Sequence, residues 1–126
     1  MTQGMHEKKT LIIEDDSLNK RLLTVIFEKM SRVETASDGR EGLNRLQMES
    51  FDLIVSDVEM PYMTGIELLI ELRKSDPGIG RRFIFFSGTA NPEHINFIKE
   101  NNLNYLRKPS HPSLLIALAE EILNIP

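Results

Sequence analysis

The stretch DLIVSDVEMPYMTG, residues 52–65, decides the fold. It opens with an apolar run that is typical of a buried strand, and the run ends at a carboxylate, Asp57. Met60 and Pro61 then prevent the strand from continuing, because proline has no backbone N–H to donate to a sheet. Thr64 and Glu67 form the capping-box pattern that begins a helix. The stretch therefore predicts a strand, a loop that carries an acid, and a helix.

The same alternation extends outward in both directions. Strands are predicted at residues 10–13, 32–36, 52–56, 82–86 and 103–107. Helices are predicted at residues 17–30, 38–49, 64–74, from 91 onward, and 112–124. Strands separated by helices imply a parallel sheet with right-handed crossovers and helices on both faces. The predicted fold is α/β, a doubly wound three-layer sandwich with five βα units.

Length and composition limit the function classes. The 126 residues predict one domain over residues 9–126, preceded by a flexible polar tail at residues 1–8. A net charge of −4 gives no reason to expect nucleic-acid binding or attraction to an anionic membrane. The absence of cysteine excludes disulfides, thiol catalysis and cysteine metal sites. No apolar run in the sequence is long enough to span a membrane, and the start lacks a secretion signal, so we expect a cytoplasmic protein without membrane insertion.

Polar residues with compatible chemistry follow four of the five predicted strands. They are Glu14, Asp15 and Asp16 after the first strand, Asp57 and Glu59 after the third, Ser87 and Thr89 after the fourth, and Lys108 after the fifth. Ligands of such sheets bind beyond the carboxyl ends of the strands, so these side chains are expected at one edge. Clustered carboxylates repel one another, and Mg²⁺ relieves that repulsion. Asp57 is then either a metal ligand or a nucleophile that accepts a phosphoryl group.

Each of these residues also has an ordinary structural explanation. Asp16 can cap the first helix, Ser87 can form a turn, and Lys108 can be a surface lysine. Glu14, Asp15 and Asp57 would be turn acids if each stood alone. Their coincidence at four strand ends on one edge favours a shared site.

Four segments in order resemble the receiver domain of two-component response regulators, in the form of the single-domain chemotaxis regulator. The segments are LIIEDD (11–16), SDVEMPYMTG (56–65), FFSGTA (85–90) and YLRKP (105–109), and the resemblance covers about residues 8–124. It implies a flavodoxin-like fold with the strand order 2-1-3-4-5. In this family the peptide bond corresponding to Lys108–Pro109 is often cis.

The resemblance implies a role for each site residue. Asp57 matches the phospho-acceptor, and Lys108 and Ser87 match its catalytic partners. Glu14 and Asp15 match the acidic pair, because that pair directly follows the first strand. With Asp57 and the backbone carbonyl of Glu59, this pair would hold Mg²⁺, or Mn²⁺ as a substitute.

The resemblance also implies partners and a mechanism. A sensor histidine kinase or a histidine phosphotransfer protein would supply the phosphoryl group, and the domain would catalyse its own phosphorylation and dephosphorylation. Ser87 and Tyr105 would form the switch that changes the surface of the fourth helix, fifth strand and last helix, where a downstream protein binds. No nucleic acid is expected to bind this domain.

Two helix faces carry further expectations. On the first helix, the apolar stripe with helical spacing consists of Leu18, Leu22, Val25, Ile26 and Met30. Leu23 and Phe27 lie off this stripe, and they either form an exposed kinase-binding face or pack under a neighbouring loop. On the fourth helix, Phe97 is expected to be exposed on the output surface. The histidines are assigned no role.

Three other functions share part of this pattern. A phosphatase or phosphotransferase for small molecules would need a cap over its substrate, for which the chain has no spare residues. A flavodoxin-like cofactor protein would need a phosphate loop where this chain has three acids, which would repel a phosphate. A receiver-like binding module that is never phosphorylated is the main alternative, and the complete set of acids, hydroxyl and lysine argues against it.

Overall fold

The computed structural model describes residues 7–125, so most of the expected tail at residues 1–8 lies outside the described residues. The strands are β1 (Lys9–Ile13), β2 (Arg32–Ala36), β3 (Leu53–Ser56), β4 (Phe83–Ser87) and β5 (Asn104–Arg107). The helices are α1 (Ser17–Phe27), α2 (Gly39–Met48), α3 (Gly65–Arg73), α4 (Pro92–Glu100) and α5 (Pro112–Leu123). A short 3₁₀ helix, η1 (Ile79–Arg82), precedes β4 and was not predicted.

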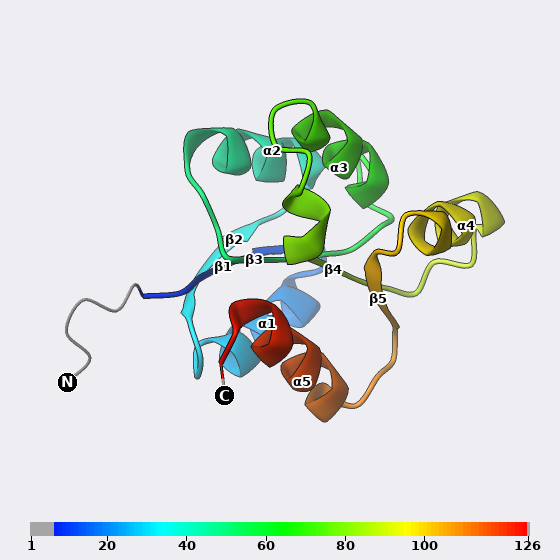
Figure 1. Cartoon of the computed structure of the whole chain (residues 1–126). Helices are drawn as coiled ribbons and strands as arrows, with labels where there is room; N and C mark the ends of the chain where they lie inside the picture. The colour runs from blue at the N-terminus through cyan, green and yellow to red at the C-terminus, as the bar shows by residue number, and fades with distance from the viewer. Residues whose placement is uncertain (1–6, 126) are drawn as a thin grey trace.

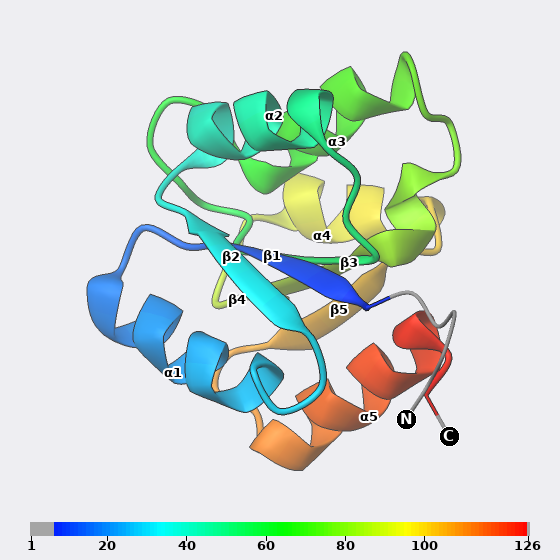
Figure 2. The ribbon, with the colours of Figure 1, turned by 90° about the vertical axis from the view of Figure 1, so that its left-hand side faces the viewer.

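All five strands are parallel and form one sheet in the order β2-β1-β3-β4-β5, as predicted. Helices α1 and α5 cover one face of the sheet, and α2, α3 and α4 cover the other (Figures 1 and 2). The chain therefore forms the predicted three-layer sandwich.

Each face of the sheet has its own apolar core, because successive side chains on a strand point to opposite faces. On β1, Leu11 and Ile13 join the core under α2, α3 and α4, whereas Ile12 joins the core under α1 and α5. On β4, Phe83 and Phe85 point to the first of these cores and stack with ring centroids 5.2 Å apart. These central strands are apolar throughout because both of their faces are covered.

The helices begin where the sequence places capping residues. Asp16 and Asp38 accept hydrogen bonds from backbone N–H groups in the first turns of α1 and α2. Thr64 and Glu67 form the complete capping box of α3. Asn91 caps α4, and a proline follows it at the start of the helix. These caps fix the loops at the carboxyl edge of the sheet, where the candidate site lies.

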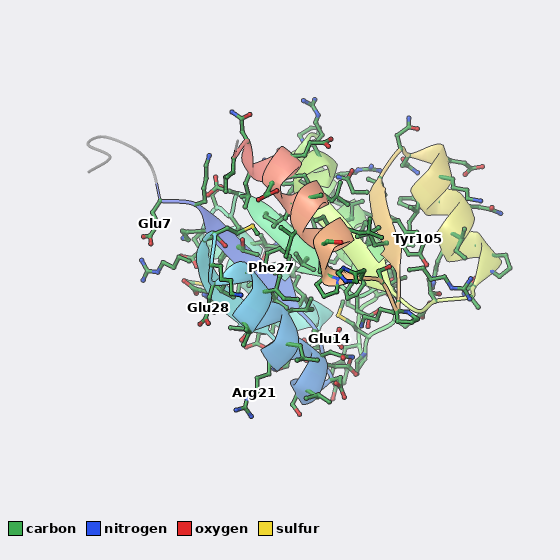
Figure 3. All side chains as sticks on the ribbon, turned by 90° about the horizontal axis from the view of Figure 1, so that it is seen from below. Glu7, Glu14, Arg21, Phe27, Glu28 and Tyr105 are labelled. Carbon is green, nitrogen blue, oxygen red and sulfur yellow. The ribbon has the colours of Figure 1, made fainter. Side chains whose placement is uncertain are left out.

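Leu23 and Phe27 on α1 do not form an exposed kinase-binding face, and part of the expected core-facing stripe is exposed instead. Phe27 is fully buried between α1 and the sheet (Figure 3). Leu23 is 5% exposed, whereas Leu22 is 55% exposed. Leu18 and Val25 are exposed as well. Two apolar stripes with helical spacing overlap on this helix. Ile26 and Met30 of the expected stripe do pack against the core under α1 and α5, together with Leu23 and Phe27.

Phe97 was also expected to be exposed but is partly buried against the core under α2, α3 and α4. The Arg73 guanidinium lies 5.8 Å from the centre of its ring. Within residues 7–125, no helix is both long enough and apolar enough to cross a bilayer.

Candidate functional site

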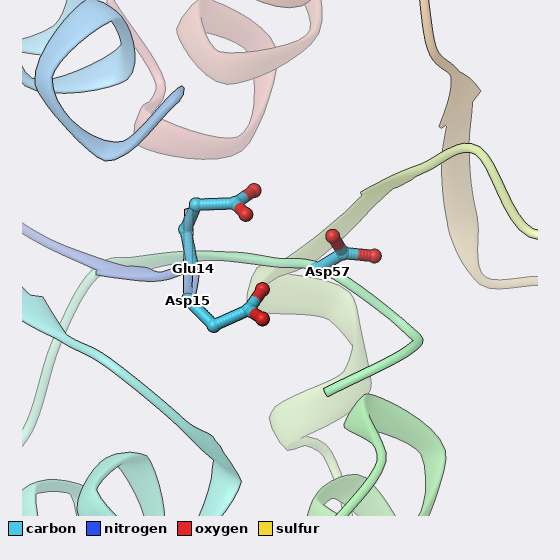
Figure 4. A group of neighbouring side chains, drawn as sticks. All are labelled: Glu14, Asp15 and Asp57. Atoms are coloured by element: carbon cyan, nitrogen blue, oxygen red, sulfur yellow. The ribbon is translucent and has the colours of Figure 1, made fainter. Parts of the chain in front are cut away.

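The acids that follow β1 and β3 lie side by side at the carboxyl edge of the sheet. The two strands pair in parallel with Ile13 opposite Ser56, so the next residue on each strand, Glu14 and Asp57, enters the same space. Asp15 joins them, and one carboxylate oxygen from each of the three residues lies within 4.8 Å of the others (Figure 4). Hard oxygen ligands at this spacing suit a divalent cation such as Mg²⁺.

Lys108 connects two of these acids. Its Nζ donates hydrogen bonds to Glu14 Oε1 at 2.7 Å and to Asp57 Oδ2 at 3.2 Å. Burial alone would lower the pKa of Lys108, but the hydrogen bond to Glu14 and the charges of both carboxylates raise it. Lys108 therefore stays charged and partly neutralises the acids.

Glu14 is the most buried of the three acids, with 2% of its surface exposed. Burial raises its pKa, and the hydrogen bonds from Lys108 and from the Asp16 backbone N–H oppose that rise. Its carboxylate is thus the one whose charge depends most on a neighbouring cation.

Asp57 is held from several directions. Its Oδ1 accepts hydrogen bonds from the Val58 N–H at 2.7 Å, the Glu59 N–H at 3.2 Å and the Ser87 hydroxyl at 2.5 Å. Its Oδ2 faces Lys108. Hydrogen bonds to both oxygens therefore fix the orientation of the carboxylate at the carboxyl edge of the sheet.

The start of α3 lies against the backbone of Asp57. A Cβ atom added to Gly65 would come within 2.4 Å of the Asp57 carbonyl oxygen. The Gly65 N–H donates to the Val58 carbonyl at 2.8 Å, which closes the loop between β3 and α3. Glycine is needed here because a side chain would displace the loop that carries the acid.

Ser87 and Tyr105 are linked through one carbonyl. Ser87 is 1% exposed, and its carbonyl accepts a hydrogen bond from the Tyr105 hydroxyl at 3.3 Å. The same carbonyl accepts from the Lys108 N–H at 3.0 Å. The Lys108–Pro109 peptide is cis, as the family resemblance implied.

The Glu59 side chain is engaged elsewhere. Its Oε2 accepts a hydrogen bond from the Thr89 hydroxyl at 2.6 Å and lies 2.6 Å from His94 Nδ1, on α4. The hydrogen bond from Thr89, together with His94, lowers the pKa of Glu59, and partial burial opposes this. The sequence reasoning gave His94 no role, since nothing in the spacing of residues 59 and 94 indicates that they meet.

The structure brings together five of the residues named from the sequence: Glu14, Asp15, Asp57, Ser87 and Lys108. Tyr105 is adjacent through the Ser87 carbonyl. Asp16 is not part of the group of three acids and caps α1 by accepting from the Asn19 N–H. The result is a group of three acids whose spacing suits a divalent cation, with a hydroxyl and a lysine bonded to one of them, Asp57.

Comparisons with known proteins agree on one family. A family model described as "Response regulator receiver domain" matches residues 10–120. The "Probable transcriptional regulator ycf29" of Porphyra purpurea is 32% identical over 117 residues, which are 90% of this chain and 55% of that protein. The "CAI-1 autoinducer sensor kinase/phosphatase CqsS" of Vibrio cholerae is 24% identical over 92% of this chain and only 17% of its own length. The chain thus spans about half or less of these two relatives.

A solved structure gives the same result at the level of the fold. The "response regulator receiver domain protein (CheY-like)" of Methanospirillum hungatei superposes with a TM-score of 0.85 and 31% sequence identity. The match covers 94% of this chain and 95% of that one.

Proposed function

The chain belongs to the family of response regulator receiver domains, and from that premise we propose that it accepts a phosphoryl group on Asp57. The observation that carries this proposal is the position of the Asp57 carboxylate, which lies between a charged lysine, a hydroxyl and two further acids. We take residues 9–126 as the receiver unit.

The proposed reaction is a transfer from phosphohistidine. A carboxylate oxygen of Asp57 attacks the phosphorus, the bond between phosphorus and the imidazole nitrogen breaks, and the imidazole leaves with the bonding electron pair. The product is an aspartyl phosphate, which water later hydrolyses to the carboxylate and inorganic phosphate. Lys108 and the Ser87 hydroxyl would each donate to a phosphoryl oxygen, since both already donate to Asp57.

The residues fit a magnesium site. Glu14, Asp15 and Asp57 supply the carboxylates, and the Glu59 carbonyl lies two residues after Asp57 in the same loop. When bound, Mg²⁺ (or Mn²⁺) would neutralise negative charge on the transferring group. Glu14, Asp15, Asp57 and the Glu59 carbonyl would hold the ion, and Lys108 would bind the phosphoryl oxygens.

The switch would begin at Ser87. The new charge on residue 57 would draw the Ser87 hydroxyl toward the phosphoryl oxygens, and this would alter the carbonyl to which Tyr105 donates. Tyr105 would then reorient and change the surface of α4, β5 and α5, where a downstream protein would bind.

The phosphodonor would be a sensor histidine kinase or a histidine phosphotransfer protein. An apolar groove of about 460 Å³ lies beside the site, between α1 and the start of α5. Leu22 and Val25 line it on one side, and Lys108 and Pro109 line it where it meets the site. A helical partner that lay in this groove would bring its histidine close to Asp57. Leu23 also lines the groove but is only 5% exposed, so the exposed Leu22 and Val25 replace Leu23 and Phe27 as the proposed contact with the kinase.

The test is the intact mass after incubation with acetyl phosphate and Mg²⁺. We expect a gain of about 80 Da, the mass of one phosphoryl group. The gain should disappear without Mg²⁺ and in Asp57→Asn. If wild type gains no mass from acetyl phosphate or from phosphohistidine on a donor protein, the chain is a binding module that is not phosphorylated.

A further inference from the structure

Three residues from separate segments form a hydrogen-bonded group beside the proposed phosphorylation site. Glu59 lies in the loop after β3, Thr89 in the loop after β4, and His94 in the first half of α4. Both contacts converge on one carboxylate oxygen, Glu59 Oε2, at 2.6 Å from the Thr89 hydroxyl and 2.6 Å from His94 Nδ1. We call these three residues the Glu59 clamp.

The hydrogen-bond directions in the clamp follow from its geometry. The Glu59 side chain is 49% exposed, and a solvent-exposed glutamate is ionised at neutral pH. An ionised carboxylate only accepts hydrogen bonds, so the Thr89 hydroxyl and the His94 Nδ1–H are both donors. Thr89 is 4% exposed, so the residues around it hold its side chain in place.

The clamp holds a fourth negative charge away from the other acids. Glu59 lies two residues after Asp57, and its backbone N–H donates to Asp57 Oδ1 at 3.2 Å. The Glu59 side chain is attached close enough to Asp57 to reach it, yet its carboxylate is not part of the group formed by Glu14, Asp15 and Asp57. The Thr89 hydroxyl and His94 Nδ1 hold the Glu59 carboxylate outside that group.

We propose that Thr89 and His94 are positioning residues that keep the Glu59 carboxylate out of the acid group, and that this placement speeds the approach of anionic phosphodonors to Asp57. The rate part of this inference rests on the proposed function. A released carboxylate would add one negative charge within a few ångströms of the point where an anionic donor must bind. Like charges at that separation repel strongly where water is partly excluded.

The experiment compares the rate at which Asp57 gains a phosphoryl group from acetyl phosphate at fixed Mg²⁺. The releasing variant is the double substitution Thr89→Val with His94→Ala, which removes both donors. The rescue variant adds Glu59→Gln, which removes the charge. Asn96→Ala, an exposed position on the same helix, is the matched control, and His94→Asn alone retains an N–H donor at the position of Nδ1.

We expect the releasing variant to react roughly three- to tenfold more slowly than wild type at low salt, with a smaller difference at high salt. The rescue variant should regain the wild-type rate or exceed it, and both Asn96→Ala and His94→Asn should resemble wild type. A merely structural role would leave the rescue variant as slow as the releasing variant and the salt dependence unchanged. Either of those results, or no slowing at all, overturns the proposal.

A second measurement, made without metal or donor, separates this proposal from the proposed function. The backbone amide NMR shifts of Asp15 and Asp57 should move in the releasing variant and return when Glu59→Gln is added. If wild type is not phosphorylated, the proposed function and the predicted effect on rate both fail. The amide shifts then test only whether Thr89 and His94 hold the Glu59 carboxylate away from the acid group. Shifts that do not move in the releasing variant overturn that part of the proposal.

Discussion

Tyr62 has a backbone conformation that its side chain disfavours. Its φ is 71°, in the left-handed region, and the Met63 N–H donates to the Pro61 carbonyl at 2.8 Å across it. This is a γ-turn with positive φ, a rare and strained form. The ring is 75% exposed, and the Arg40 guanidinium lies 4.3 Å from its centre. The backbone of the loop that follows Asp57 is therefore strained at Tyr62, and the exposed ring contributes little burial to offset that strain.

We predict that Tyr62→Gly raises the free energy of unfolding by roughly 0.5–1 kcal/mol, because glycine adopts positive φ without a steric cost. Urea unfolding followed by circular dichroism measures this. Tyr62→Ala is the control: it removes the ring and its contact with Arg40 but keeps a Cβ, so it should not stabilise. Equal stability of the two variants would mean that the loop is not strained.

Lys108 competes with any cation for the acids, since its Nζ bonds to both Glu14 and Asp57. We predict that Lys108→Met lowers the dissociation constant for Mg²⁺ by roughly tenfold, because a positive charge a few ångströms from the ion is removed. Calorimetric titration of Mg²⁺ measures this directly. Lys99→Met, an exposed lysine on α4, should leave the constant unchanged. Equal affinity in wild type and Lys108→Met would show that the ion binds away from these acids.

At the scale of the element, α1 carries two overlapping apolar stripes that differ in how deeply their leucines are buried. Leu23 belongs to the core under α1 and α5, whereas Leu22 is 55% exposed. We predict that Leu23→Ala costs about 2–5 kcal/mol of unfolding free energy, as for other buried leucines. Leu22→Ala should cost no more than about 0.5 kcal/mol, because it leaves no cavity. Chemical denaturation of both variants measures the difference, and similar losses would mean that both stripes are buried.

The end of α2 is tied to β1 by charge. Glu49 accepts from Lys9 Nζ and from Arg45, each at 3.2 Å. The hydrogen bond from Lys9 lowers the pKa of Glu49 below 4.5, and Arg45 contributes in the same direction. A lowered folded-state pKa gives stability above the pKa of the unfolded chain, which is lost as pH falls through the folded-state value.

Glu49→Gln should therefore be slightly less stable than wild type at pH 7. The difference should shrink as the pH falls below about 4.5, the ordinary pKa of the group. Thermal unfolding of both proteins from pH 3 to pH 7 measures it. A difference that stays constant over this range would exclude an electrostatic origin. Glu100→Gln, on the exposed face of α4, is the matched control.

At the scale of the whole molecule, the sequence predicted the layers well. The strands at 10–13 and 52–56 lie within one residue of β1 and β3, because continuous apolar runs are typical of strands covered on both faces. The caps at Asp38, Thr64 and Asn91 predicted where helices begin, because each side chain acts within its own turn.

Features that depend on distant parts of the chain were not predicted. The contact of Glu59 with His94 joins positions 35 residues apart, and no local pattern encodes it. The buried face of α1 depends on how the helix rotates against the sheet, and two stripes satisfied the same spacing. The acid group was predictable because the carboxyl ends of parallel strands lie at one edge of the sheet, so residues that directly follow different strands lie close together.

The tight approach of α3 to the site has a consequence for how the sequence can diverge. A Cβ at Gly65 would meet the Asp57 carbonyl oxygen at 2.4 Å, and one at Gly39 would meet the Met63 carbonyl oxygen at 2.4 Å. Both obstacles are backbone atoms, which cannot rotate away as a side chain can. Any residue other than glycine at position 39 or 65 would place a Cβ against the backbone of the loop that carries Asp57 and displace it. We therefore expect glycine to be retained at both positions as the sequence diverges.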